Sequence, residues 1–166
     1  MRVYHNFLIN KEMAKFKTMK GQFKPKNPSK YFGGDPSSIT YRSSWEFTCM
    51  QTFDENPMIL GWGSETCAIP YINPFTRRST VYIPDFVVVY EDRNGKKHAE
   101  MIEVKPAKEV PGMLAENKKL TPKDKAAQLL NMAKWEAANR FCKKRGMQFR
   151  VLTEFHIYSG MKGGKK

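Results

Sequence analysis

The sequence predicts a single α/β domain in which a helix and three strands are followed by a second helix and a last strand. Three observations support this fold class. The chain has 166 residues, of which 40% are hydrophobic and 13% aromatic, and this is enough to build one hydrophobic core. Apolar side chains recur at helical spacing in two segments. Runs rich in β-branched and aromatic residues, which are typical of strands, lie between and after these segments.

The first helix is expected to begin at Ser43, because serine commonly caps helix N-termini. Apolar side chains then recur along one helix face, at Trp45, Cys49, Met50 and Phe53. Pro57 is expected to end this helix. Residues 58–72 predict an irregular strand or a strand pair with a bulge at its glycines, and INPFTRRS predicts a turn.

Two strand patterns are predicted to form a hairpin over residues 81–105. The first is VYIPDFVVVY at 81–90, and the second is KKHAEMIEVK at 96–105. The intervening EDRNG segment has the residue types of a turn.

The second helix is expected after residues 106–120, which predict a loop or a partly ordered segment. Thr121 can cap the helix, Pro122 suits its first position, and Asp124 suits its positive N-terminal end. One face is apolar, at Leu130, Ala133, Ala137 and Phe141. Gly146 is expected to end the helix, and residues 147–158 predict the final strand.

The two ends of the chain are basic. Residues 1–37 contain many lysines and few acids and predict an extended arm, which either is a solvated tail or lies along DNA phosphates. Residues 38–158 are expected to form the domain, and residues 159–166 a flexible basic tail.

The net charge of +13 and the sequence pI of about 9.7 favour a polyanionic partner, which is most often nucleic acid. A basic protein without such a partner is the alternative. No apolar run approaches 18 residues, so no membrane span is expected. Three widely spaced cysteines fit buried thiols in a reducing compartment.

The hairpin is predicted to bring acidic side chains together. If Arg93-Asn94-Gly95 forms a three-residue loop with Gly95 in the left-handed region, Asp92 faces Lys96, and Asp85 lies opposite Glu103. Directly opposed residues share a face with Cβ atoms about 4.5–5.5 Å apart. Lys105 lies on the same face as Glu103, because alternate residues of a strand point the same way.

Two neighbouring carboxylates repel each other unless positive charge lies between them. Lys105 can supply part of that charge, and a divalent cation can supply more. Asp85 and Glu103 oxygens, with the Val104 backbone carbonyl, water and phosphate, are the ligands that Mg²⁺ prefers, and we expect Mn²⁺ to substitute. The alternative is a structural ion pair between Glu103 and Lys105 on a solvated face.

A third acid, Glu46, lies at the start of the first helix. Ser43 and Glu46 have the spacing of a capping box, in which Glu46 accepts from the Ser43 amide. If the helix packs beside the hairpin, Glu46 can instead complete the metal shell. Arg42 is a candidate for a phosphate contact or an ordinary surface arginine.

These residues resemble a known superfamily. Glu46, Pro84-Asp85 and Glu103-Val104-Lys105 are similar to the motifs of the PD-(D/E)xK nucleases. The chain over about residues 22–156 most resembles TnsA-type endonuclease domains and, above all, the head-completion nucleases of tailed phages. TnsA-type sequences often have Gln where this chain has Glu103. The resemblance implies a restriction-endonuclease-like αβββαβ core with a mixed central sheet flanked by helices.

The expected activity is metal-dependent hydrolysis of DNA phosphodiester bonds during head completion after packaging. The resemblance implies products with 5′-phosphate and 3′-hydroxyl ends. Asp85 and Glu103 are expected to hold the metal with help from Glu46, and Lys105 to orient water or neutralise developing charge. DNA-backbone contacts are expected from the N-terminal lysines and from Lys123, Lys125 and Lys134 of the second helix. Gln128 and Lys134 are candidates to face the site and contact DNA there, and the alternative is that both are ordinary surface residues.

Three alternatives stay open: a Holliday-junction resolvase, a transposase-type endonuclease, and a non-catalytic DNA-binding head-assembly protein. The expected location is the host cytoplasm or the virion. Phage portal, neck or capsid proteins are candidate partners, and the oligomeric state is undetermined by the sequence.

Overall fold

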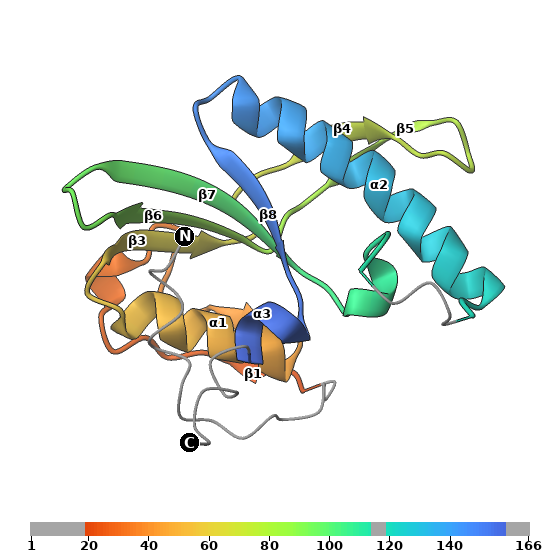
Figure 1. The fold of residues 1–166 in the computed structure, drawn as a ribbon. Coiled ribbons are helices and arrows are strands. Elements are labelled where there is room, and N and C mark those ends of the chain that lie inside the picture. Colours follow the sequence, from red (N-terminus) through yellow and green to blue (C-terminus); the bar gives the residue numbers. More distant parts are fainter. Residues whose placement is uncertain (1–18, 114–118, 159–166) are drawn as a thin grey trace, which may run out of the picture.

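A four-stranded sheet forms the centre of the structure, a computed structural model that describes residues 19–113 and 119–158 (Figure 1). Its strand order is β3-β6-β7-β8, with β6 antiparallel to β3 and β7, and β8 parallel to β7. The strands are β3 (Ile59–Ser64), β6 (Phe86–Glu91), β7 (Lys97–Val104) and β8 (Gln148–Leu152). The predicted mixed sheet in an α/β fold is therefore confirmed.

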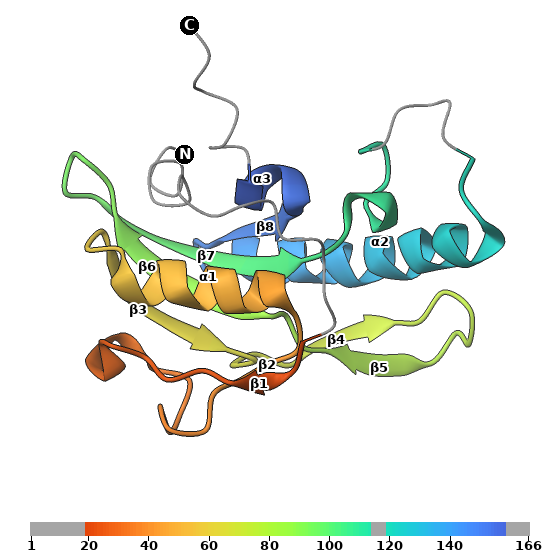
Figure 2. The same cartoon turned by 90° about the horizontal axis from the view of Figure 1, so that it is seen from below.

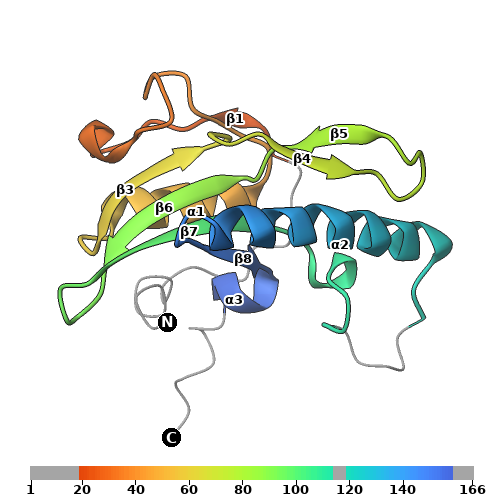
Figure 3. The same ribbon diagram turned by 90° about the horizontal axis from the view of Figure 1, so that it is seen from above.

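One long helix covers each face of this sheet (Figures 1 and 3). Trp45 and Phe53 of α1 (Ser44–Glu55) share a buried cluster with Ile102 of β7. On the other face, Trp135 of α2 (Pro122–Lys143) shares a second cluster with Met101. Adjacent residues of β7 therefore pack into different cores, because successive side chains of a strand point to opposite faces.

The caps that begin both helices lie at the predicted residues. Ser43 accepts the Glu46 amide at the start of α1. Thr121 and Asp124 form a capping box at the start of α2. Gly146, beyond the end of α2, has a φ of 65°, in the left-handed region that favours glycine. The loop after β7 contains a short 3-10 helix, η2 (Ala107–Glu109).

The prediction of one strand over residues 81–90 is wrong, because residues 83–85 interrupt the strand. Residues before the break form β5 (Ser79–Tyr82), which pairs with β4 (Ile69–Ile72) in a separate two-stranded sheet. Pro84 cannot donate to a strand ladder, which accounts for the interruption. The hairpin of β6 and β7 accordingly spans 86–104, and the β4–β5 hairpin extends from the body of the molecule (Figure 2).

The predicted strand over residues 147–158 is also too long. β8 ends at Leu152, and Glu154–Tyr158 form the short helix α3. Thr153 starts this helix: its amide and hydroxyl lie 3.1 Å and 3.0 Å from His156 Nδ1, and its carbonyl accepts the Ile157 amide. Ile157 is buried in the cluster on the α1 face, so helix formation places it in the core.

Part of the basic N-terminal segment packs onto the domain. It contains β1 (Gly21–Gln22) and η1 (Pro28–Lys30). β1 pairs with β2 (Thr40–Tyr41), which follows the segment. Phe23 is buried, with ring centroids 5.8 Å from Phe47 and 5.7 Å from Trp62. Asp54 accepts the amides of Lys26 and Asn27. The earlier part of the expected arm, 1–18, and the expected tail, 159–166, lie outside the described residues.

Phe23→Ala tests whether this segment belongs to the cooperative fold. Removing a buried aromatic ring is expected to lower the free energy of unfolding by about 3–5 kcal/mol, measured by urea denaturation. Phe155→Ala removes a ring that is 55% exposed and should change it by no more than about 0.5 kcal/mol. Equal effects of the two changes would show that the segment is not part of the cooperative unit.

Candidate active site

Asp85 and Glu103 lie next to each other at the end of the β6–β7 hairpin. Phe86 pairs with Ile102, so one further step along the register sets Asp85 beside Glu103. The turn that fixes this register has the predicted form, since Gly95 has a φ of 75° and the Asp92 amide donates to the Lys96 carbonyl. Glu103 lies on the same face of β7 as Met101, toward α2.

Each carboxylate has its own hydrogen-bond donor. Asp85 Oδ2 accepts the Val104 amide at 2.7 Å. Glu103, which is 3% exposed, accepts the Tyr82 hydroxyl at Oε2 over 2.7 Å. Its other oxygen, Oε1, lies 3.2 Å from Lys105 Nζ. The structure therefore brings three of the predicted site residues into one cluster, which we call the acid–lysine cluster: Asp85, Glu103 and Lys105.

The charges in the acid–lysine cluster shift one another's titration. Burial and the neighbouring charge of Glu103 raise the pKa of Asp85 well above its usual range, against the opposing effects of the Val104 amide and Lys105. Burial lowers the pKa of Lys105, but Glu103 and Asp85 together outweigh it and leave that pKa raised. Lys105 thus stays protonated at neutral pH. Its single positive charge offsets only part of the negative charge that two ionised acids would carry.

Glu46 lies at the N-terminus of α1, where its two oxygens accept from the Ser43 hydroxyl and the Arg42 amide, each at 2.9 Å. The predicted capping box is therefore modified, because the Arg42 amide donates to Glu46 in place of the Ser43 amide. The Glu46 charge also raises the pKa of Asp85, but by less than burial and the charge of Glu103 do. The Arg42 guanidinium pairs with Glu65, which raises the Arg42 pKa.

The residues of α2 that were predicted to contact DNA have different surroundings. Lys134 is half-buried, with Nζ 6.0 Å from the ring centroid of Tyr71 and 5.7 Å from that of Tyr82. Burial, and next to it the charge of Lys105, lower the Lys134 pKa, so this lysine faces the acid–lysine cluster. Gln128 instead donates to the Lys108 carbonyl at 2.8 Å. Lys123 and Lys125 are exposed in the first turns of α2.

Tyr82 is the site residue that sequence reasoning missed. In one continuous strand, Tyr82 and Asp85 would point to opposite faces, because their positions differ by an odd number. The break at residues 83–85 removes this restriction, and Tyr82 reaches Glu103 from the smaller sheet. A tyrosine two residues before the Pro84-Asp85 pair was the available signal.

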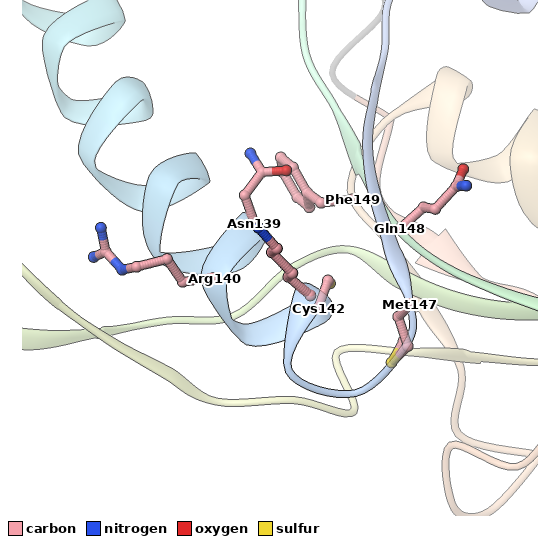
Figure 4. Close-up of a pocket in the computed structure, with 7 residues that line it drawn as sticks. Asn139, Arg140, Cys142, Met147, Gln148 and Phe149 are labelled. Carbon is pink, nitrogen blue, oxygen red and sulfur yellow. The ribbon is translucent and has the colours of Figure 1, made fainter.

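A separate hollow lies at the C-terminal end of α2 and the start of β8 (Figure 4). Its volume is about 440 Å³, and its lining includes Arg140, Cys142 and Gln148. No carboxylate lines it. It is therefore distinct from the acid–lysine cluster, since its lining residue Gln148 pairs with Glu100 and not with Glu103.

The donor set of the cluster fits a small hard dication. Mg²⁺ is commonly held by one or two carboxylates, with waters and substrate phosphates as its other ligands. Asp85 and Glu103 supply such a pair, and their mutual repulsion, seen in the Asp85 pKa, is what a cation would relieve. Within residues 19–113 and 119–158, no three or more His, Cys, Asp or Glu side chains are grouped to hold a metal ion.

Comparisons with known proteins show which family the chain belongs to. A family model described as TnsA-like endonuclease N terminal matches residues 56–154, which include the acid–lysine cluster, Tyr82 and Lys134. The head completion nuclease of Enterobacteria phage T4 is 39% identical over 150 residues, covering 86% of this chain and 97% of that protein. No solved structure gives a significant match. The chain therefore belongs to the TnsA-like endonuclease family.

Proposed function

We propose that this protein is a Mg²⁺-dependent DNA endonuclease that hydrolyses phosphodiester bonds during phage head completion, after packaging. The observation that carries this proposal is the acid–lysine cluster, in which two carboxylates share one face beside a lysine. Membership of an endonuclease family supports the reaction class. The relative named head completion nuclease supports the biological setting.

In this proposal, Asp85 and Glu103 hold the metal, with the Val104 carbonyl as a further ligand and Glu46 assisting directly or through water. When bound, the cation supplies Lewis-acid polarisation of the phosphate and lowers the pKa of water. Lys105, held by Glu103 at 3.2 Å, orients the attacking water or neutralises charge that develops on the phosphorane. Tyr82 fixes the Glu103 carboxylate through its hydroxyl.

DNA binding in this proposal depends mainly on phosphate contacts. Lys134 faces the cluster, Lys123 and Lys125 are exposed on the same helix, and Arg42 lies at the start of α1. Such contacts position the substrate and make affinity fall with salt. Gln128, bound to Lys108, is a weaker candidate because its amide is already engaged.

The proposed setting is the host cytoplasm or the virion, with portal, neck or capsid proteins as candidate partners. Across the described part of the chain, no helix has the length and apolar character needed to cross a bilayer.

Asp85→Asn tests the catalytic assignment. Asparagine can still accept the Val104 amide, so folding should persist, whereas DNA cleavage in Mg²⁺ should fall by at least about 100-fold. Gel assays of plasmid nicking and linearisation measure the loss. Glu136→Gln is the matched control, since it neutralises an exposed acid on α2 and should leave cleavage intact. Parental cleavage by the Asp85 variant would refute the assignment.

Metal binding should appear as stabilisation of the folded protein. At a Mn²⁺ concentration of 100 times Kd, the free energy of unfolding should rise by about 2.7 kcal/mol in the parent and not in Asp85→Asn. Without cation, stability should fall as pH rises from the usual Asp value of 3.8 through the raised pKa of Asp85, because the folded state holds that proton more tightly. The Mn²⁺ effect should grow over the same range.

If Mn²⁺ stabilises the parent and the Asp85 variant equally, the metal does not bind at Asp85. Thermal melting and urea denaturation at several pH values provide both measurements.

Tyr82→Phe tests the positioning of Glu103. Loss of one hydroxyl keeps the ring in its core but frees a buried carboxylate oxygen, so activity should fall by about 10- to 100-fold. A purely structural role would leave the metal requirement unchanged. We expect instead that the Mg²⁺ concentration for half-maximal cleavage rises, and an unchanged midpoint would remove Tyr82 from the metal site.

A further inference from the structure

The turn of the β4–β5 hairpin carries an aromatic ring and two arginines. Its residues 73–78 include Phe75, which is 56% exposed, and Arg77 and Arg78, both exposed. The turn projects beyond the central sheet in the three ribbon views (Figures 1 to 3). An exposed ring between basic side chains is a combination that nucleic-acid-binding surfaces use.

Hydrogen bonds hold this turn in one conformation. Asn73 Oδ1 accepts the Phe75 amide at 2.9 Å and the Thr76 amide at 3.2 Å. The Asn73 carbonyl accepts the Arg77 amide, and the Asn73 amide donates to the Arg78 carbonyl, both at 2.9 Å. Phe75 is therefore presented by an ordered turn, which reduces the entropy lost when the ring binds a partner.

The two arginines lack the acidic neighbours that three other arginines of the described residues have. Arg42, Arg140 and Arg150 each lie within ion-pair distance of a glutamate. Among the residues that the structure describes, no carboxylate lies that close to Arg77 or Arg78. Their positive charge is available to an anionic partner, and phosphates fit the guanidinium group.

The hairpin leads directly from this turn to the active site. Its inner face packs toward α2 through Ile69, Tyr71 and Tyr82, and Tyr82 bonds Glu103. The four residues of β5 span roughly 13 Å at about 3.3 Å per residue. At about 3.4 Å per nucleotide along a DNA strand, the length of β5, which lies between the turn and Tyr82, corresponds to roughly four nucleotides.

We propose that Phe75 stacks on an unpaired or terminal DNA base, while Arg77 and Arg78 bind the flanking phosphates. The preferred substrate class is then DNA with an accessible base about four nucleotides from the cleaved phosphate, such as a frayed end, flap or junction. This inference rests on the proposed nuclease function and specifies its substrate.

The charge of the turn favours DNA over a protein partner. The outward face of the hairpin is apolar at Ile72 and Val81, as a protein interface would be. The projecting end, however, presents the two arginines, and the whole chain has a net charge of +13. Aromatic rings flanked by phosphate-binding arginines suit single-stranded bases.

Binding is best measured on the Asp85→Asn protein, which retains the turn without cleaving DNA. The probes are two labelled DNAs of equal length: a covalently closed circular duplex without unpaired or terminal bases, and a fork with unpaired bases. Fluorescence anisotropy at fixed salt should show that adding Phe75→Ala weakens fork binding by about fivefold or more and binding of the circular duplex by less than twofold. Phe75→Trp should restore fork binding, and Phe155→Ala, at similar exposure, should change neither.

The arginines are tested in the same background. Joint replacement of Arg77 and Arg78 by Ala should weaken binding of both DNAs and reduce the salt dependence of affinity. Arg93→Ala is the control, because Arg93 is an exposed arginine in the turn at the far end of β7. Equal effects of the Arg93 and Arg77/Arg78 changes would overturn the assignment of phosphate contacts.

Cleavage by the protein with Asp85 intact separates the two proposals. If it cleaves the fork and Phe75→Ala has no effect on binding or weakens both DNAs equally, stacking is refuted and the nuclease function stands. An apolar hairpin that binds a protein would then be the better explanation. If the parent neither binds nor cleaves either DNA, both proposals fail.

Discussion

The repulsion between two neighbouring carboxylates is the constraint around which the rest of the site is arranged. A tight hairpin register holds Asp85 beside Glu103, and burial together with the charge of Glu103 raises the pKa of Asp85. Each nearby polar group offsets part of that cost. The Val104 amide donates to Asp85, while Tyr82 and Lys105 engage the two oxygens of Glu103. A fold that keeps such a pair beside a lysine has retained an arrangement suited to a cation rather than to maximal stability.

Separate layers of the fold supply the parts of this arrangement. β7 carries Glu103 and is followed directly by Lys105, and the link between the two sheets carries Asp85. Tyr82 comes from the smaller sheet, and Lys134 from the helix that packs against it. Glu46, at the start of α1, influences Asp85 through its charge while its oxygens complete the helix N-terminus. The acid–lysine cluster is thus coupled to the packing of α2 against β4 and β5.

Local chemistry made much of this fold readable from the sequence. The Arg93-Asn94-Gly95 turn set the hairpin register, and this was enough to pair Asp85 with Glu103. Helix starts followed from Ser43 and Thr121, whose side chains have specific backbone partners. The two wrongly predicted strands were changed by tertiary contacts that the local sequence does not show. Pairing of β5 with β4 divided the apolar run at Pro84, and burial of Ile157 favoured a helix after Thr153. Tyr82 could not be assigned while residues 81–90 were read as one strand.

The loop that follows β7 is held by residues far along the chain. The Lys105 amide donates to the Leu152 carbonyl, and the Ala107 amide donates to Glu154, a partner 47 positions later. During translation, Lys105 and Ala107 are synthesised before both of these partners. Its backbone therefore acquires its final restraint only after β8 has joined the sheet. A nascent chain that ends before β8 contains every residue of the acid–lysine cluster but not the backbone contact that restrains its lysine, so the cluster is completed late in synthesis.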